Sequence, residues 1–278
     1  MNEIVVAVIL GIVEGLTEFL PVSSTGHLIL VGNWLQFTGE KANTFEIFIQ
    51  LGAILAVLGY FRERIWNLVR AVLGQPMKTN NPHAMTVEQA RRFAVGVILA
   101  FIPAAIIGFF LHDKIEELLF TPKTVAAALV VGGVGIIAIE KLNLRAKTET
   151  MEAMTWAQAI WVGLAQCLSL IPGMSRSAST IMGGLVTGLS HAAAAEFSFF
   201  LAIPTIGAAT VYSLLKNLKL LNADDAVVFT VGFVVSLVVA WIVIAAFMSF
   251  IKKHSFEAFG WYRIILGFAI LIMIAVQG

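Results

Sequence analysis

The stretch GIVEGLTEFLPVSSTGH, residues 11–27, decides how the rest of this chain folds. Residues 4–20 are apolar enough for a membrane segment, yet they include Glu14 and Glu18. An ionised carboxylate in hydrocarbon is costly, so such residues face a protein interior or a wet cavity and usually mark function. Their spacing places both carboxylates on one face of a helix. A purely structural contact between helices is the alternative, but two carboxylates on one face favour a functional site.

Pro21 interrupts this helix, and the hydroxyl residues Ser23, Ser24 and Thr25 can cap the start of a second one. The start of that helix presents unpaired N–H groups and a positive dipole end, which together suit an anion and above all a phosphate. His27 follows Ser24 by three residues on the same side of the helix. We therefore expect it within general acid or base reach of the Ser24 hydroxyl. A capping role for the hydroxyls would produce the same pattern.

The composition is that of a polytopic membrane protein. Of 278 residues, 59% are hydrophobic and 13% are charged, and the mean hydropathy is +0.91. Soluble domains contain about half apolar and about a quarter charged residues. The net charge of +1, without a basic arm, gives no indication of nucleic-acid binding. A single cysteine, Cys167, excludes an internal disulfide and multi-cysteine metal sites. Glu3 replaces the basic start of a signal peptide, so we expect no cleavable signal.

Six segments are candidates to cross a bilayer, which requires about 20 apolar residues. They are residues 45–61, 93–111, 125–139, 192–215, 226–251 and 260–276. The pieces on either side of Pro21 are each too short, so we expect a re-entrant hairpin that is buried in protein or lines water. We predict an all-α fold with six transmembrane helices and two re-entrant helical hairpins, forming one membrane domain over residues 1–278.

The second hairpin comes from a repeat of the first. GLAQCL at 163–168 resembles GIVEGL at 11–16, and IPGMSRS at 171–177 resembles LPVSSTG at 20–26. Glu196 and Glu46 each precede a matching apolar run, and both lie near the end of a span. Arg176 lies at the tip of the second hairpin beside two serines, which suits bidentate recognition of phosphate better than simple neutralisation of a glutamate.

The basic residues predict which side of the membrane each loop faces. Loops 62–92, 141–155 and 252–263 carry 6, 3 and 3 Lys or Arg residues, whereas loops 112–123 and 216–225 carry 2 each. With six spans the three basic loops fall on one side, which we expect to be cytoplasmic. The mouth of the first hairpin then faces outward. The repeats, at about 1–140 and 156–278, are inverted, an arrangement that places broken helices tip to tip near the midplane.

The motifs EGLTEFLPVSSTGH at 14–27 and PGMSRS at 172–177 together closely resemble the undecaprenyl-diphosphate phosphatases of the bacitracin-resistance family. The resemblance covers essentially the whole chain. It implies removal of the terminal phosphate from undecaprenyl diphosphate, which recycles the lipid carrier of peptidoglycan synthesis and confers bacitracin resistance. It also implies a bacterial inner membrane location and dependence on a divalent cation, Mg²⁺ or Ca²⁺.

Phosphoryl transfer requires mainly positioning and charge neutralisation, which these residues can supply. We expect Glu14 and Glu18 to bind the cation. Ser24 is our first choice of nucleophile, with His27 or Glu18 relaying protons, and a water activated by His27 is the alternative. The predicted catalytic residues are Glu14, Glu18, Ser24, His27 and Arg176. The predicted phosphate-binding residues are Ser23, Thr25, Ser175, Arg176 and Ser177.

Two other classes of function compete with this interpretation. Inverted repeats with broken helices are typical of transporters and lipid flippases, which need binding groups and a gate but no nucleophile. A structural scaffold would leave the buried glutamates and Arg176 unexplained. The expected partners are the lipid substrate and membrane lipids, without nucleic acid, and a homodimer is one candidate assembly.

Overall fold

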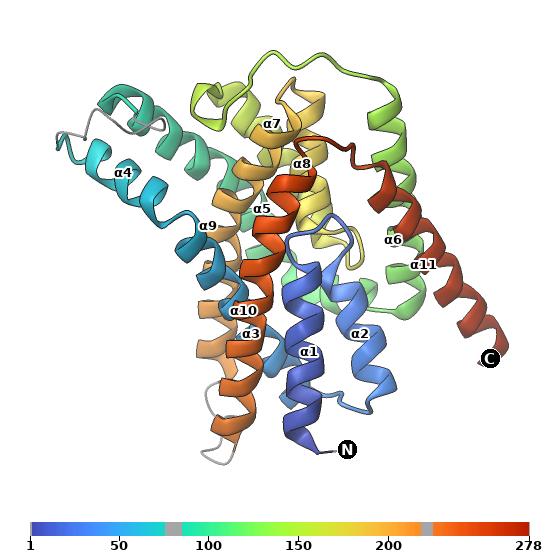
Figure 1. Ribbon diagram of the computed structural model, residues 1–278. Coiled ribbons are helices and arrows are strands. Elements are labelled where there is room, and N and C mark those ends of the chain that lie inside the picture. The colour runs from blue at the N-terminus through green and yellow to red at the C-terminus, as the bar shows by residue number, and fades with distance from the viewer. Residues whose placement is uncertain (1, 76–84, 218–224, 278) are drawn as a thin grey trace.

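The computed structural model describes residues 2–75, 85–217 and 225–277, and the regular elements in these residues are helices (Figure 1). Six of the described helices are long and apolar enough to cross a membrane, which confirms the predicted all-α membrane fold. They are α3 (Glu40–Tyr60), α5 (Val87–Leu119), α6 (Pro122–Lys141), α9 (His191–Asn217), α10 (Ala226–Phe250) and α11 (Glu257–Gln277).

Two pairs of short helices flank the predicted helix interruptions at Pro21 and Pro172, which we call the first and second chain breaks. The first pair is α1 (Glu3–Thr17) and α2 (Ser24–Trp34). The second is α7 (Trp156–Gln166), extended by the 3₁₀ turn η2 (Cys167–Leu170), and α8 (Arg176–Val186). Helices α2 and α8 each contain 11 residues. That both pairs are re-entrant, and that the two halves are inverted repeats, stay predictions.

Close packing of glycines against backbone holds the long helices together. A Cβ atom added to Gly11 or Gly15 of α1 would lie 2.7 Å from the Gly232 carbonyl oxygen or 2.8 Å from that of Ser236, both in α10. Small residues at helix interfaces let backbones approach in this way within membranes. In Figure 1, α1 lies along α10 near the middle of the bundle, and α11 lies along α6 at its right edge.

A cluster of phenylalanines fills the core beside the first chain break. The Phe19 ring, fully buried, meets the Phe199 ring edge to face with centroids 5.3 Å apart. Phe61 and Phe200 extend the same cluster. Large apolar side chains also cover the outer surface, for example Ile265 of α11, which is 67% exposed. An apolar exterior is stable where hydrocarbon is the solvent.

Three connections differ from the sequence prediction. The loop expected at 62–92 contains the helix α4 (Arg62–Val72), and α5 continues to Leu119 through residues expected to form a connection. Helix α11 begins at Glu257, so Arg263, expected in a basic loop, lies inside a helix and is fully buried. Hydropathy marks the limits of apolar sequence, whereas backbone hydrogen bonding and tertiary packing set the ends of a helix.

Candidate active site

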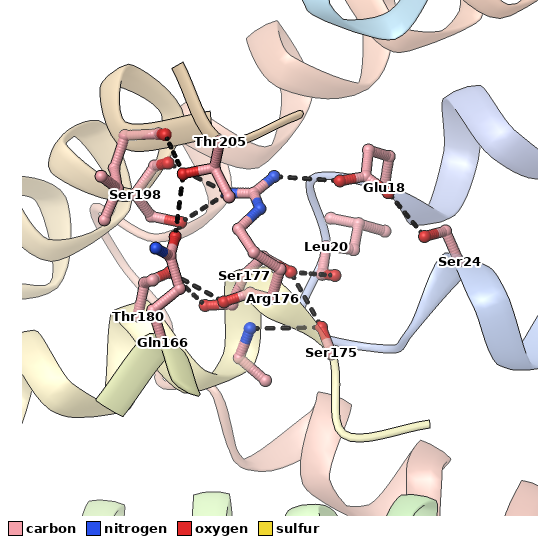
Figure 2. A network of polar contacts seen from close by, with 12 residues as sticks. Glu18, Leu20, Ser24, Gln166, Ser175, Arg176, Ser177, Thr180, Ser198 and Thr205 are labelled. Atoms are coloured by element: carbon pink, nitrogen blue, oxygen red, sulfur yellow. Dashed lines mark hydrogen bonds and ion pairs between the residues drawn. The ribbon is translucent and has the colours of Figure 1, made fainter. Parts of the chain in front are cut away.

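The two pairs of short helices meet at the carboxylate of Glu18, at the C-cap of α1 (Figure 2). Its Oε2 accepts a hydrogen bond from Ser24 Oγ at 2.5 Å, and its Oε1 lies 3.1 Å from Arg176 Nη2 in an ion pair. The Glu18 residue is only 7% exposed. A serine hydroxyl of the first helix pair and a guanidinium of the second therefore share one buried carboxylate.

Arg176, the first residue of α8, spans the space between Glu18 and α9. Its Nη1 donates to the backbone oxygen of Ser198 at 2.9 Å and to Ser198 Oγ at 3.1 Å. Thr180, one turn further along α8, forms a hydrogen bond with that serine hydroxyl, with its Oγ1 2.7 Å from Ser198 Oγ. The Arg176 Nε is buried and has no hydrogen-bond partner among the described residues. A guanidinium carries five N–H donors, so Arg176 can keep its α9 contact and still donate to a phosphate.

Glu14 has no such partners. Both of its carboxylate oxygens are buried, and neither has a hydrogen-bond partner among the described residues. Glu18, Glu46 and the Arg176 guanidinium lie within electrostatic range of it. A buried carboxylate without a partner is strongly unfavourable, so the arrangement suits a bound cation. Hard divalent cations prefer oxygen ligands, and Glu14 and Glu18 can provide them.

The structure describes no group of three or more His, Cys, Asp and Glu side chains arranged to hold a metal. The predicted cation would take Glu14 and Glu18 from the protein, and substrate oxygens and water would complete its coordination. Mg²⁺ commonly binds proteins in this way, through one or two carboxylates together with substrate phosphates. The donor set thus fits the predicted cation.

His27 lies near this cluster but contacts other groups. Its Nδ1 lies 2.7 Å from the backbone oxygen of Ser23, and its Nε2 lies 2.6 Å from the Tyr262 hydroxyl. The two rings are stacked, with centroids 5.6 Å apart. The expected contact between His27 and Ser24 is not made, because the Ser24 hydroxyl points back to Glu18. Of the two residues predicted to relay protons, Glu18 is the one in contact with Ser24.

The other predicted phosphate ligands are partly engaged in holding the hairpins. Ser23 and Ser175 are N-caps, and each accepts a hydrogen bond from the N–H three residues on, at 3.3 Å and 3.2 Å. Their φ angles of 74° and 73° are unusual for residues with a side chain, and such strain concentrates at functional sites. Ser177 Oγ donates to the Leu20 carbonyl at 2.7 Å, and the half-buried Thr25 hydroxyl makes none of the described hydrogen bonds.

Glu196, the counterpart of Glu46 in the second half, does not join the cluster. It forms an ion pair with Arg64 of α4 at 2.9 Å, and Arg64 also pairs with Glu152. Both carboxylates thus share one guanidinium away from the Glu18 cluster, an arrangement that suits a structural role.

Sequence reasoning missed Tyr262 and Arg263, which reach the chain breaks from the other end of the chain. Tyr262 contacts His27, and Arg263 donates to the backbone oxygens of Pro21 and Gly173. A signal was available, because Arg263 is the single charged residue in the apolar run 258–276. A charged residue inside an apolar helix usually marks function, by the same argument that was applied to Glu14 and Glu18.

Comparison with known proteins shows the family of this chain. Residues 7–269 match the family model described as bacitracin resistance protein BacA. The undecaprenyl-diphosphatase of Ectopseudomonas mendocina (strain ymp) is 52% identical over 265 residues, which cover 95% of this chain and 92% of that protein. That of Aromatoleum aromaticum (strain DSM 19018 / LMG 30748 / EbN1) is 49% identical over 267 residues, covering 96% and 93%. The chain therefore belongs to the bacitracin resistance protein BacA family.

Proposed function

We propose that this protein hydrolyses undecaprenyl diphosphate to undecaprenyl phosphate and inorganic phosphate. One observation carries the proposal. A buried carboxylate, Glu18, contacts both a serine hydroxyl and a guanidinium within a membrane protein. The names of the relatives support the choice of substrate. The reaction would recycle the lipid carrier for peptidoglycan synthesis in the bacterial inner membrane and confer resistance to bacitracin.

Ser24 is the proposed nucleophile. Its oxygen forms a bond to the terminal phosphorus while its proton passes to Glu18, which already accepts a hydrogen bond from it. The bond between that phosphorus and the bridging anhydride oxygen breaks, and undecaprenyl phosphate leaves. Water then attacks the phosphoserine, releases inorganic phosphate and restores the Ser24 hydroxyl. In the alternative route, Glu18 or His27 activates water for direct attack, and Ser24 binds phosphate.

Charge neutralisation comes from groups at the two chain breaks. Arg176 donates to the phosphate, and the starts of α2 and α8 add their positive dipole ends. Glu14 and Glu18 would hold Mg²⁺ or Ca²⁺. When bound, such a cation neutralises the diphosphate oxygens. The unpartnered oxygens of Glu14 support this assignment.

The proposed site opens to the periplasmic or extracellular side. This orientation follows from the Lys and Arg residues of 62–92 and 141–155, 6 and 3 in number, which favour a cytoplasmic position. The connection before α11, predicted on the same side, carries Lys252 and Lys253, whereas Arg263 lies inside the helix. The polyprenyl tail would leave the site sideways between the helices, into the bilayer.

Phosphate release by the purified protein in detergent tests this proposal. We expect undecaprenyl diphosphate to yield one phosphate per lipid, and undecaprenyl phosphate, the control substrate, to yield none. EDTA should stop the reaction and added Mg²⁺ or Ca²⁺ should restore it. Release that persists in EDTA would remove the cation from the mechanism. A wild-type protein that releases no phosphate would refute the proposed activity.

A further inference from the structure

The guanidinium of Arg263 contacts both chain breaks at once. Its Nη1 donates to the Pro21 carbonyl at 3.2 Å, and its Nη2 donates to the Gly173 carbonyl at 2.9 Å. Pro21 precedes Ser24 by three residues, and Gly173 precedes Arg176 by three residues. One side chain therefore binds the carbonyl of the third residue before the start of each helix, α2 and α8.

Two further hydrogen bonds anchor this guanidinium on α6. Its Nε donates to the Leu129 carbonyl at 3.4 Å, and its Nη2 also donates to the Ala128 carbonyl at 3.2 Å. All four acceptors are neutral backbone oxygens, and Arg263 is completely buried. Burying a guanidinium without a carboxylate partner is costly, and packing alone would be served better by an apolar side chain. What the arginine provides is a planar fork that reaches several carbonyls in different directions.

The backbone around Arg263 leaves room for it. A Cβ atom on Gly132 of α6 would lie 2.2 Å from Arg263 Nη2 and 2.9 Å from its Cζ. Gly173 has a φ of +93°, and a Cβ atom there would lie 2.5 Å from the Val125 carbonyl oxygen of α6. The second chain break can thus approach α6, and its carbonyl can reach the guanidinium, only with glycine at this position.

We propose that Arg263 is a positioning residue that fixes the starts of α2 and α8 relative to each other. Glu18 contacts Ser24 of one helix and Arg176 of the other, so both contacts require the two helix starts to stay in register. Arg263 is buried behind the chain breaks and has no exposed surface with which to touch a substrate. The inference rests on the proposed phosphatase function for its kinetic consequence, though not for its geometry.

The sharpest variant moves the guanidinium and leaves every charge in place. Gly132→Ala introduces a methyl group at the Nη2 position, and the flexible arginine must shift away from Gly173 and Ala128. Gly135→Ala is the matched control, since a Cβ atom on Gly135, in the same helix, meets nothing within 4 Å. Both changes favour the helical state.

We expect Gly132→Ala to lower kcat by about 100-fold, because small misplacements of reacting groups have effects of that size. KM should change by less than about threefold, since the charges that bind phosphate remain. Gly135→Ala should match the wild type. Both are assayed per mole of folded protein that elutes as a single peak, so reduced folding alone would not alter kcat. Wild-type kcat in Gly132→Ala would overturn the proposal.

A distance measurement tests the positioning without any substrate. Spin labels replace Trp34 and Val186, which are 79% and 58% exposed at the ends of α2 and α8, in a Cys167→Ser background. We expect a narrow distance distribution in the wild type and in Gly135→Ala, and a broader or shifted one in Gly132→Ala. An unchanged distribution would refute the positioning role. A wild type that releases no phosphate would refute the phosphatase alone.

If Gly132→Ala fails to fold, kcat and the distance distribution are measured with Arg263→Lys instead. Lysine keeps the charge, but its single ammonium group cannot reach Pro21 and Gly173 as the fork does. We expect it to lower kcat and broaden the distance distribution as Gly132→Ala does. Full activity together with an unchanged distance would show that the charge alone matters, and the proposal would be wrong.

Discussion

Glu14 and Glu18 are one helical turn apart, yet their surroundings differ. Glu18 contacts a serine hydroxyl and a guanidinium, whereas neither oxygen of Glu14 has a hydrogen-bond partner among the described residues. Different surroundings give identical carboxylic acids different tasks. We assign proton transfer to Glu18 and cation binding to both, with Glu14 as the residue devoted to the cation.

Glu14→Gln should therefore reduce activity but not stability. The change removes a buried carboxylate without a partner, so in EDTA we expect a melting temperature equal to or above that of the wild type. A cation contributes several kcal/mol to a transition state, so kcat should fall by at least about 100-fold. Mg²⁺ should raise the melting temperature of the wild type but not of the variant. An equal Mg²⁺ effect on both proteins would exclude Glu14 as a ligand.

Arg176→Lys should be nearly as inactive as Arg176→Ala. The arginine donates to Ser198 on one side and to Glu18 on the other, and a single ammonium group cannot do both. We expect kcat/KM to fall by about 100-fold or more in both variants, the scale of losing one charge-stabilising contact. If lysine retains most of the activity, Arg176 provides charge rather than geometry.

Ser24→Ala separates the covalent route from direct attack by water. With Ser24 as nucleophile, the variant should bind substrate but release no phosphate. Rapid-quench labelling with substrate carrying a ³²P terminal phosphate should trap label on the Ser24 peptide. The 2.5 Å contact with Glu18 supports this route, because the proton acceptor is already in place. Measurable hydrolysis by Ser24→Ala with a raised KM would instead support an activated water.

At the scale of elements, broken helices position the site and unbroken ones support it. Helices α2 and α8 begin at strained serine caps, and Ser177 ties the second break to the Leu20 carbonyl of the first. Helix α1 is held in turn against α10 by close approach at Gly11 and Gly15. The position of Glu18 therefore depends on contacts that lie outside the site.

Gly15→Ala should destabilise the protein through this interface. The added Cβ atom would lie 2.8 Å from the Ser236 carbonyl oxygen, which is rigid backbone, so α1 must move. Overpacking of this kind costs about 1–3 kcal/mol, and the melting temperature in detergent should fall. Gly207→Ala in α9 is the control, because a Cβ atom there meets nothing within 4 Å. Equal melting temperatures for both variants would show that the α1–α10 contact can adjust.

At the scale of the whole molecule, the six long helices and the charge of the loops determine how the protein sits in the membrane. The N-terminus and the ends of α1 and α2 that lie away from the chain break occupy one end of the bundle in Figure 1. If the three basic loops are cytoplasmic, the chemistry takes place on the outer side.

Cysteine labelling in intact cells tests this orientation. In a Cys167→Ser background, Gln75→Cys should resist an impermeant thiol reagent, because the six basic residues of 62–92 favour the cytoplasm. Glu117→Cys, near the end of α5, should react. Labelling after the cells are permeabilised serves as the control that both cysteines are accessible. The reverse pattern would place the site on the cytoplasmic side.

The sequence by itself determined the class of fold and singled out the main residues of the candidate site. Membrane spans can be predicted because each must satisfy its backbone hydrogen bonds within its own helix. A run of about 20 apolar residues therefore indicates one. Glu18, Ser24 and Arg176 stood out because polar groups at membrane depth are costly, and the structure brings them together. The helix starts could be predicted from Pro21, Pro172 and the serines that follow.

Only the tertiary structure decided which of these groups touch. The spacing of His27 and Ser24 allowed a contact, but Ser24 instead donates to Glu18 across the chain break. Arg263 was counted in a loop because Lys and Arg near a span end usually face water, whereas here it bonds carbonyls from three separate segments. These contacts of Arg263 join residues 242, 135 and 90 positions apart, and local sequence does not indicate which distant carbonyl a buried donor will meet.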